Sequence, residues 1–174
     1  MSFTTPPVVT FQNPEINAEE NLNKLVFDQT VLIQPTLSFL DAYAVMPSDN
    51  GTAVAVGADV SFNRIAATSA YDITATTASR FTLGPIGVYQ VDFNVPFDGS
   101  GQLVLTLNNV QLAQTVVGKL ATGYVSGSYI IATTAVNSIV TVRNPTGNPT
   151  ALTISTSLGG TLPVSAHLVI TRLR

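Results

Sequence analysis

The side chains that could carry out catalysis are few, and histidine is the scarcest of them. The chain has 174 residues, with a single histidine, His167, and no cysteine. Thiolate nucleophiles, disulfides and thiolate metal sites are therefore excluded, and a Ser-His-Asp triad would have to use His167. No serine stands in the Gly-x-Ser-x-Gly pattern of an activated nucleophile. A lone histidine in a strand is more typical of a packed or interface residue, so the sequence predicts no catalytic residue and no enzyme.

The carboxylates do not form a catalytic set either. A glycosidase-type pair would have to come from scattered aspartates, of which Asp92 and Asp98 are close in sequence. Asp98 falls in a glycine-rich turn, where the backbone alone favours aspartate. Gly57, Gly84 and Gly87 do not open a helix, so no phosphate-binding loop is expected. The sequence therefore predicts no cofactor.

The charge distribution divides the chain at about residue 37. Charged residues make up only 10% of the sequence, against 45% hydrophobic residues. Residues 1–37 carry a net charge of −3, whereas six aspartates and six basic residues balance to zero in 38–174. A neutral domain without a basic stripe does not attract nucleic acid over a distance. The chain also has no apolar run of about 18 residues and no signal-peptide pattern at its start, so we expect neither nucleic-acid nor membrane binding.

Alternating apolar and polar residues predict strands from residue 39 onward. The alternation runs along 89–95 and again along 103–107, on either side of a glycine-rich turn at 98–101. This pattern is typical of two half-buried strands in a hairpin, with Tyr89, Val91, Phe93 and Val95 facing inward. Many short strands without helices between them predict an all-β sandwich or jelly roll. The expected strands are 39–46, 53–57, 60–65, 71–75, 79–83, 87–97, 102–108, 110–118, 124–133, 138–143, 151–157 and 164–173.

Residues 1–37 predict an N-terminal arm ahead of the domain at 38–174. Three prolines within the first 14 residues favour an extended start. Asn17 can then cap a short helix, with Glu20 at the capping-box position. The arm contains too many apolar residues for a free tail, so we expect it to dock on the domain or on another copy.

Several motifs in 38–174 together resemble a known family. They are Tyr43-Ala44-Val45, the stretch 54–63, Phe81-Thr82-Leu83, the stretch 84–89, residues 105–108 and the closing stretch 166–170. In this order they resemble the C-terminal globular domain of the collagen-like glycoproteins of Bacillus spore surfaces, within the complement-head and tumour-necrosis-factor-like (TNF-like) superfamily. The collagen-like Gly-X-Y stalk itself is missing.

The resemblance implies a TNF-like jelly-roll sandwich of about ten antiparallel strands that forms a homotrimer. The first and last strands should lie together in the sheet that meets the neighbouring copies. Some members of this superfamily bind calcium, for which Asp49 and Asp59 are the donors near a loop, although we assign no metal site. The candidates for the core or the trimer interface are Tyr43, Tyr89, Phe93, His167 and Val169.

Two functions follow from the resemblance. The first is a non-enzymatic structural homotrimer in or on a bacterial spore outer layer, made in the mother cell without a signal peptide. Phe27-Asp28 and Pro35-Thr36-Leu37 resemble the motif that anchors such proteins in the exosporium, so other spore-layer proteins would be partners of the arm. The alternative is a trimeric receptor- or glycan-binding module of a phage fibre or cell-surface type, displayed on a virion. Such a fibre tip should expose loop aromatics, and only Tyr71 and Tyr124 qualify.

Overall fold

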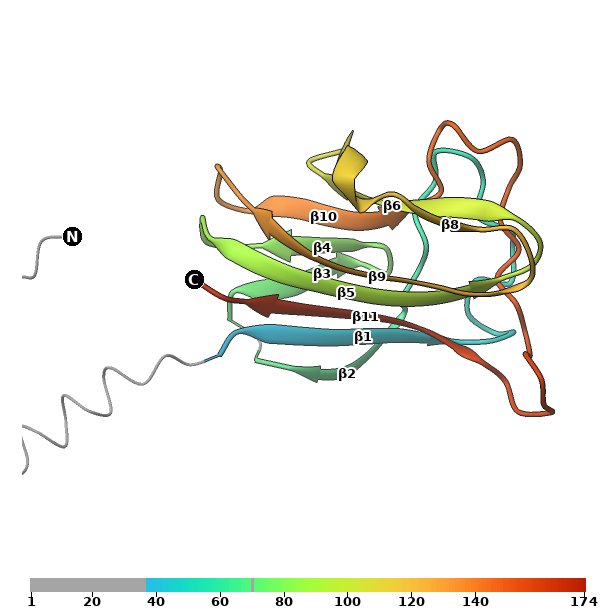
Figure 1. Ribbon diagram of the computed structural model, residues 1–174. Helices are drawn as coiled ribbons and strands as arrows, with labels where there is room; N and C mark the ends of the chain where they lie inside the picture. Colours follow the sequence, from blue (N-terminus) through green and yellow to red (C-terminus); the bar gives the residue numbers. More distant parts are fainter. Residues whose placement is uncertain (1–36, 70) are drawn as a thin grey trace, which may run out of the picture. The chain divides into compact units, whose positions relative to one another are not determined.

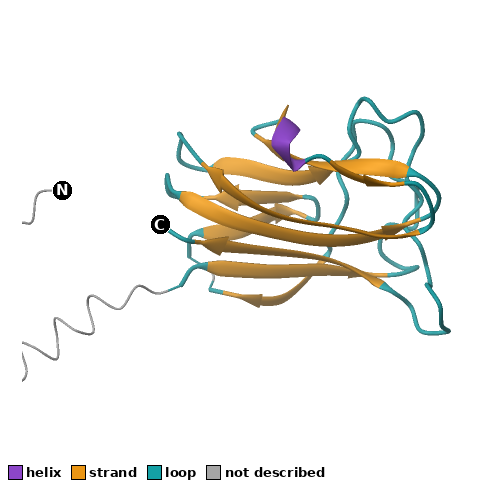
Figure 2. Ribbon diagram, viewed as in Figure 1, coloured by secondary structure: helices purple, strands orange, loops and turns teal. Residues whose placement is uncertain are grey.

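The computed structural model describes residues 37–69 and 71–174, which form two facing antiparallel sheets (Figure 1 and Figure 2). The predicted arm helix and the anchor candidates Phe27, Asp28, Pro35 and Thr36 lie outside the described residues; Leu37 is described and exposed. The first sheet has the order β2 (Arg64–Thr68), β1 (Phe39–Val45), β11 (Ser165–Arg172), β5 (Val88–Phe97), β9 (Gly123–Ala132). The second has the order β3 (Ile73–Thr77), β4 (Arg80–Leu83), β10 (Ser138–Arg143), β6 (Gly101–Leu107), β7 (Val110–Gln111), and β8 (Val117–Lys119) also pairs with β6.

The last strand of the domain lies in the middle of the first sheet. β11 pairs with β1 on one side, where Tyr43 is opposite His167, and with β5 on the other, where Phe93 is opposite Leu168. The first and last strands therefore lie together, as expected. Because side chains alternate along a strand, Leu168 faces the core and His167 faces away from it. The all-β jelly-roll prediction is confirmed, with eleven strands in the described residues.

The core fills the space between the two sheets. The predicted inward face of β5 is correct, since Tyr89, Val91, Phe93 and Val95 are all buried. The Tyr89 hydroxyl donates a hydrogen bond of 2.7 Å to the Pro85 carbonyl oxygen, and burial raises the pKa of this tyrosine. The second sheet contributes the facing side chains Phe81, Leu83, Leu103, Leu105, Val140 and Val142.

Gly87, just before β5, is required by a close approach of the C-terminus. A Cβ atom there would lie 2.2 Å from the Arg174 carbonyl oxygen, which accepts a hydrogen bond from the Val88 amide. Any larger residue would push the C-terminal residues away from β5. The reason for the glycine is therefore this contact between segments far apart in the sequence.

The predicted strands at 53–57, 60–65 and 151–157 are wrong. Val54 and Leu152 form an isolated bridge, Ile154 forms another with Phe97, and β2 begins only at Arg64. These segments belong to the loops at the end of the sandwich away from the C-terminus (Figure 1). Their apolar side chains are buried because they close that end of the core. In the sequence, these apolar residues therefore look like the buried residues of a strand.

The predicted strand at 110–118 is interrupted by the 3-10 helix η1 (Ala113–Thr115), which separates β7 from β8. Thr115 is buried there, and its hydroxyl oxygen accepts a hydrogen bond of 2.9 Å from the Leu105 amide. A side chain thus takes the place of a backbone partner of β6, which an alternation pattern does not reveal.

Strand β6 is buried on both faces rather than on one. Leu103, Val104, Leu105 and Thr106 are all buried. On the outer face, Thr106 pairs with Thr141 of β10, and their hydroxyl oxygens lie 2.8 Å apart. The loop that carries Asp59 pairs with the end of β10 and covers this face.

We predict that Tyr89→Ala lowers the free energy of unfolding by about 3–5 kcal/mol, because it removes a fully buried ring and leaves a cavity. Tyr71→Ala is the matched control: Tyr71 is exposed, so its loss should change stability by less than about 0.5 kcal/mol. Denaturant titration of both variants measures the difference. Equal stability of the two variants would contradict the assigned face of β5.

Candidate functional site

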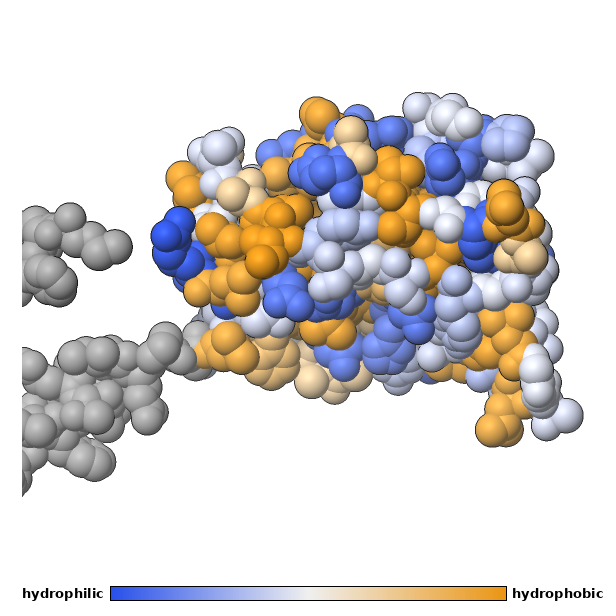
Figure 3. All heavy atoms as spheres, in the orientation of Figure 1, coloured by the Kyte–Doolittle hydropathy of each residue, from blue (hydrophilic) through white to orange (hydrophobic). Residues whose placement is uncertain are grey.

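The outward side of the first sheet is a broad regular surface, and we call it the open face. It is crossed by β1, β11, β5 and β9, which run over the front of Figure 1. Figure 3 shows hydrophilic and hydrophobic residues interspersed over the same side of the molecule. The side chains of the open face include Phe39, Asp41, Tyr43, Val45, Val88, Gln90, Asp92, Asn94, Tyr124, Ser126, Ser128, Ile130, His167, Val169 and Thr171.

His167 lies on the open face beside a carboxylate and an aromatic ring. Its Nδ1 atom is 3.2 Å from Oδ1 of Asp41. Its ring stacks on Tyr43, with 5.7 Å between centroids and 18° between planes. The Asp41 oxygen is buried and yet accepts no well-aligned hydrogen bond in the described part of the chain. The β1–β11 register creates this cluster, because it sets Tyr43 directly opposite His167.

The cluster around His167 lacks a nucleophile. The serines of the open face, Ser126 and Ser128, are on β9, and β5 separates that strand from β11. Two strand spacings amount to roughly 10 Å, so neither serine can share a hydrogen bond with the imidazole. The arrangement supports packing and recognition rather than acyl transfer.

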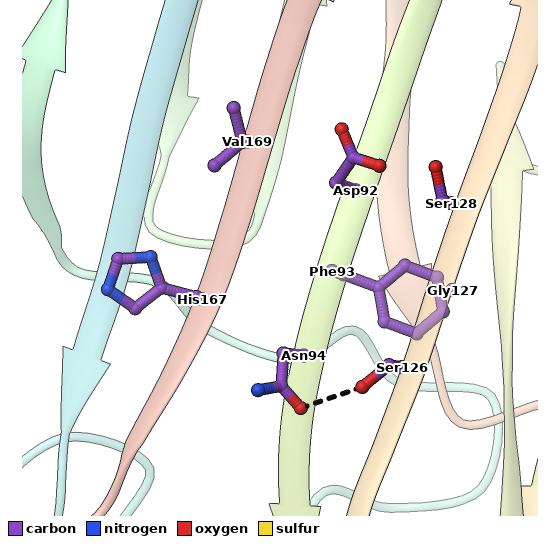
Figure 4. Close-up of a pocket in the computed structure, with 8 residues that line it drawn as sticks. All are labelled: Asp92, Phe93, Asn94, Ser126, Gly127, Ser128, His167 and Val169. Carbon is purple, nitrogen blue, oxygen red and sulfur yellow. Dashed lines mark hydrogen bonds between the residues drawn. The ribbon is translucent and has the colours of Figure 1, made fainter.

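A shallow hollow of about 510 Å³ occupies the middle of the open face. Its depth comes from the small residues of β9, where Gly127 lies between two serines (Figure 4). The polar groups at its edge bond to one another: Ser126 donates to Asn94 over 3.0 Å, as Figure 4 shows, and Gln90 donates to Asp92 over 3.0 Å. The hollow is lined by Asp92, Phe93, Asn94, Ser126, Gly127, Ser128, His167 and Val169.

The five residues expected in the core or the trimer interface fall into two groups. Tyr89 and Phe93 are buried, and the Phe93 ring lies 6.4 Å from the ring of Tyr129. Tyr43, His167 and Val169 are half-buried on the open face. The structure therefore brings three of the five together on one surface and places the other two behind it.

Comparison with known proteins gives matches among solved structures alone. No protein-family model matches the chain, and no curated protein matches it. The globular domain of zebrafish complement 1qA protein is 15% identical with a TM-score of 0.55, and the match covers 78% of this chain and 96% of that one. Murine APRIL is 14% identical with a TM-score of 0.57, covering 79% and 100%. Eiger TNF from S. frugiperda is 17% identical with a TM-score of 0.53, covering 79% and 94%.

The fold is the C1q/TNF-like jelly roll. The likeness therefore supports the fold that the sequence resemblance implied. In this C1q/TNF-like domain, the described residues include no helix of the length and apolarity that a membrane span requires.

The aspartates considered for calcium are held by arginines in the C1q/TNF-like domain. Asp49 lies 2.7 Å from Nε of Arg64, and Asp59 lies 2.6 Å from Nε of Arg143. The hydrogen bond from Arg64 is the main cause that lowers the pKa of Asp49. Within 37–69 and 71–174, no group of three or more His, Asp or Glu side chains could hold a metal ion. The two carboxylates therefore act in separate ion pairs.

Asn50, the acceptor of the Asn50-Gly51-Thr52 glycosylation pattern, is also occupied. Its side-chain nitrogen donates to the Ser61 carbonyl oxygen over 2.8 Å, and its oxygen accepts from the Ser61 amide over 3.0 Å. The side chain ties two parts of one loop together, and its amide does not project freely from the surface.

Sequence reasoning selected none of the residues around a second hollow, on the outer face of the second sheet. This hollow has a volume of about 270 Å³ and is lined by Arg80, Asn108, Asn109, Ile139, Thr141 and Arg143. In the sequence, its arginines contribute only to the balance of charge in 38–174. No sequence signal would have found the hollow, because its lining comes from β4, β10 and the β6–β7 turn.

Proposed function

We propose that this protein is a non-enzymatic homotrimer in which the open face meets a second copy of the chain. The observation that carries the proposal is the Asp41–Tyr43–His167 cluster: a stacked, half-buried ring pair beside a carboxylate, in a broad sheet surface. A neighbouring copy would cover these rings. The sequence resemblance also implies a threefold neighbour at this sheet.

The proposed interface differs in chemistry from an ordinary obligate one. Obligate interfaces are mostly apolar, whereas the open face combines two carboxylates, Asp41 and Asp92, with Asn94 and two serines. Its larger apolar side chains include Tyr124 and Ile130, both on the edge strand β9. The partner copy must therefore bring hydrogen-bond donors to the centre of the face and apolar contacts to the β9 side.

For the biological setting, we propose a structural role in or on a bacterial spore outer layer. This proposal rests on the sequence resemblance and on the apolar, acidic arm at 1–37, which would link the trimer to other spore-layer proteins. Scarce charge and the lack of thiols suit a long-lived surface component. The alternative, a binding module on a virion or cell surface, is favoured by one structural observation: the hollow beside Arg80 on the second sheet.

We predict that light scattering of the full chain gives about three times its 18.3 kDa mass, and that Val169→Arg reduces this to the monomer mass. Val169 lies between Asp41 on β1 and Asp92 on β5. An arginine there can pair with either carboxylate, so the single chain stays folded while its bulk blocks a neighbour. Val110→Arg, at an exposed position on β7 of the other sheet, is the matched control and should leave the trimer intact. A wild-type monomer, or equal masses for the two variants, would contradict the proposal.

We predict that a chain lacking residues 1–37 remains folded and trimeric but no longer enters the spore layer. The described domain begins at Leu37 and has its own core, so the deletion removes no core side chain. Immunolocalisation in sporulating cells that express either form measures incorporation. Normal incorporation of the truncated chain would show that the arm is not the anchor, and labelling confined to virions would favour the alternative.

A further inference from the structure

Arg80 is one of two basic side chains of the domain that lack a partner among the described residues. Three arginines pair with aspartates at 2.6–2.8 Å: Arg64, Arg143 and Arg172. Lys119 donates to the carbonyl oxygens of Phe97, Gly99 and Ala121. Among the described residues, Arg80 makes no ion pair or side-chain hydrogen bond, and neither does Arg174 at the C-terminus.

The unpaired guanidinium borders the 270 Å³ hollow on the second sheet. In β4, Phe81 faces the core opposite Val140, so Arg80 and Thr82 point to the outer face. Thr82 is opposite Ile139, and Ile139 and Thr141 line the hollow from β10. The result is a concave surface with a half-buried isoleucine in its lining and a free positive charge at its edge.

The other walls of the hollow are fixed by hydrogen bonds. Asn108 and Asn109 both have positive φ, at 50° and 69°, as a tight hairpin turn requires. The Asn108 side chain accepts a bond of 2.8 Å from the Ile139 amide, which ties the turn to β10. Opposite, the guanidinium of Arg143 binds both oxygens of Asp59, over 2.6 and 3.2 Å. The walls are thus set before any ligand arrives, which reduces the entropic cost of binding.

The charge of the hollow indicates a singly charged anion. Asp59 neutralises Arg143, so Arg80 leaves a net charge of +1. A carboxylate matches the two parallel N–H donors of one guanidinium and cancels this charge. A doubly charged phosphate would remain half uncompensated. The Asn109 amide, which makes no side-chain hydrogen bond among the described residues, can serve a hydroxyl group, and Ile139 can pack against the carbon face of a ring.

We propose that this hollow binds the carboxylate of an acidic sugar residue, with Arg80 holding the carboxylate and Asn109 a hydroxyl group. Its volume is near the lower end of small-molecule pockets, which suits one monosaccharide unit. Hexuronic acids and sialic acids both carry a carboxylate together with hydroxyl groups. The hollow is on the second sheet and the proposed trimer contact is on the first, so the sugar site does not rest on the trimer.

The test is a titration of the ¹⁵N-labelled full chain with three sugars: glucuronic acid, N-acetylneuraminic acid and neutral glucose. We expect amide shifts around Asn109 and Ile139 with at least one acidic sugar and none with glucose. Arg80→Gln should weaken binding at least about ten-fold, because one charge-assisted bidentate contact is lost. Arg80→Lys, which keeps the charge without the two-donor geometry, should fall between. Asn109→Gly keeps the positive-φ turn and should weaken binding a few-fold.

Arg174→Gln is the matched control, since it removes an unpaired arginine outside the hollow and should leave the affinity unchanged. Tighter binding of glucuronic acid would indicate a hexuronic acid as the natural ligand, and tighter binding of N-acetylneuraminic acid would indicate a sialic acid. No shifts with either acidic sugar, equal binding of glucose, or equal affinities of Arg80→Gln and Arg174→Gln would overturn the proposal. None of these results would alter the mass measured by light scattering, so the two proposals can fail separately.

Discussion

The position of β11 between β1 and β5 is the constraint on which the rest of the domain depends. β11 completes the middle of the first sheet, so this sheet forms only when β11 pairs with β1, 120–132 positions away, and with β5, 73–83 positions away. That register buries Leu168 against the core and exposes His167 beside Tyr43. A slip of one residue would exchange the two faces along the whole strand. The core and the open face are therefore set by the same pairing.

Much of the fold could be predicted because the long strands alternate regularly. In Val88–Phe97 the alternation shows the inward face directly in sequence, and the face of Tyr89, Val91, Phe93 and Val95 was assigned correctly. The wrong strand predictions arose where apolar residues are buried without the hydrogen-bonded pairing of a sheet. Val54 and Leu152 close the end of the sandwich from loops. Val104 and Thr106 are covered by a distant loop. Such burial depends on tertiary neighbours that a local pattern does not contain.

The candidate surfaces were harder to predict than the fold, and the reason is electrostatic. A sequence shows that six basic residues balance six aspartates in 38–174, but not which of them pair. The structure shows that Asp49 and Asp59 are held by Arg64 and Arg143. It also shows that Arg80 has no such partner among the described residues. The open face and the outer hollow thus differ in charge and lie on different sheets.

The central claim is that the open face is covered by a second copy, and thiol accessibility tests it most directly. The chain has no cysteine, so one engineered thiol reports a single position. Ser128 is exposed on the open face of the single chain, and Ser100 is exposed in the β5–β6 turn. The account predicts that Ser128→Cys reacts with a bulky thiol reagent much more slowly than Ser100→Cys, and that its reaction accelerates on dilution. Equal reaction rates of the two variants at every protein concentration would contradict it.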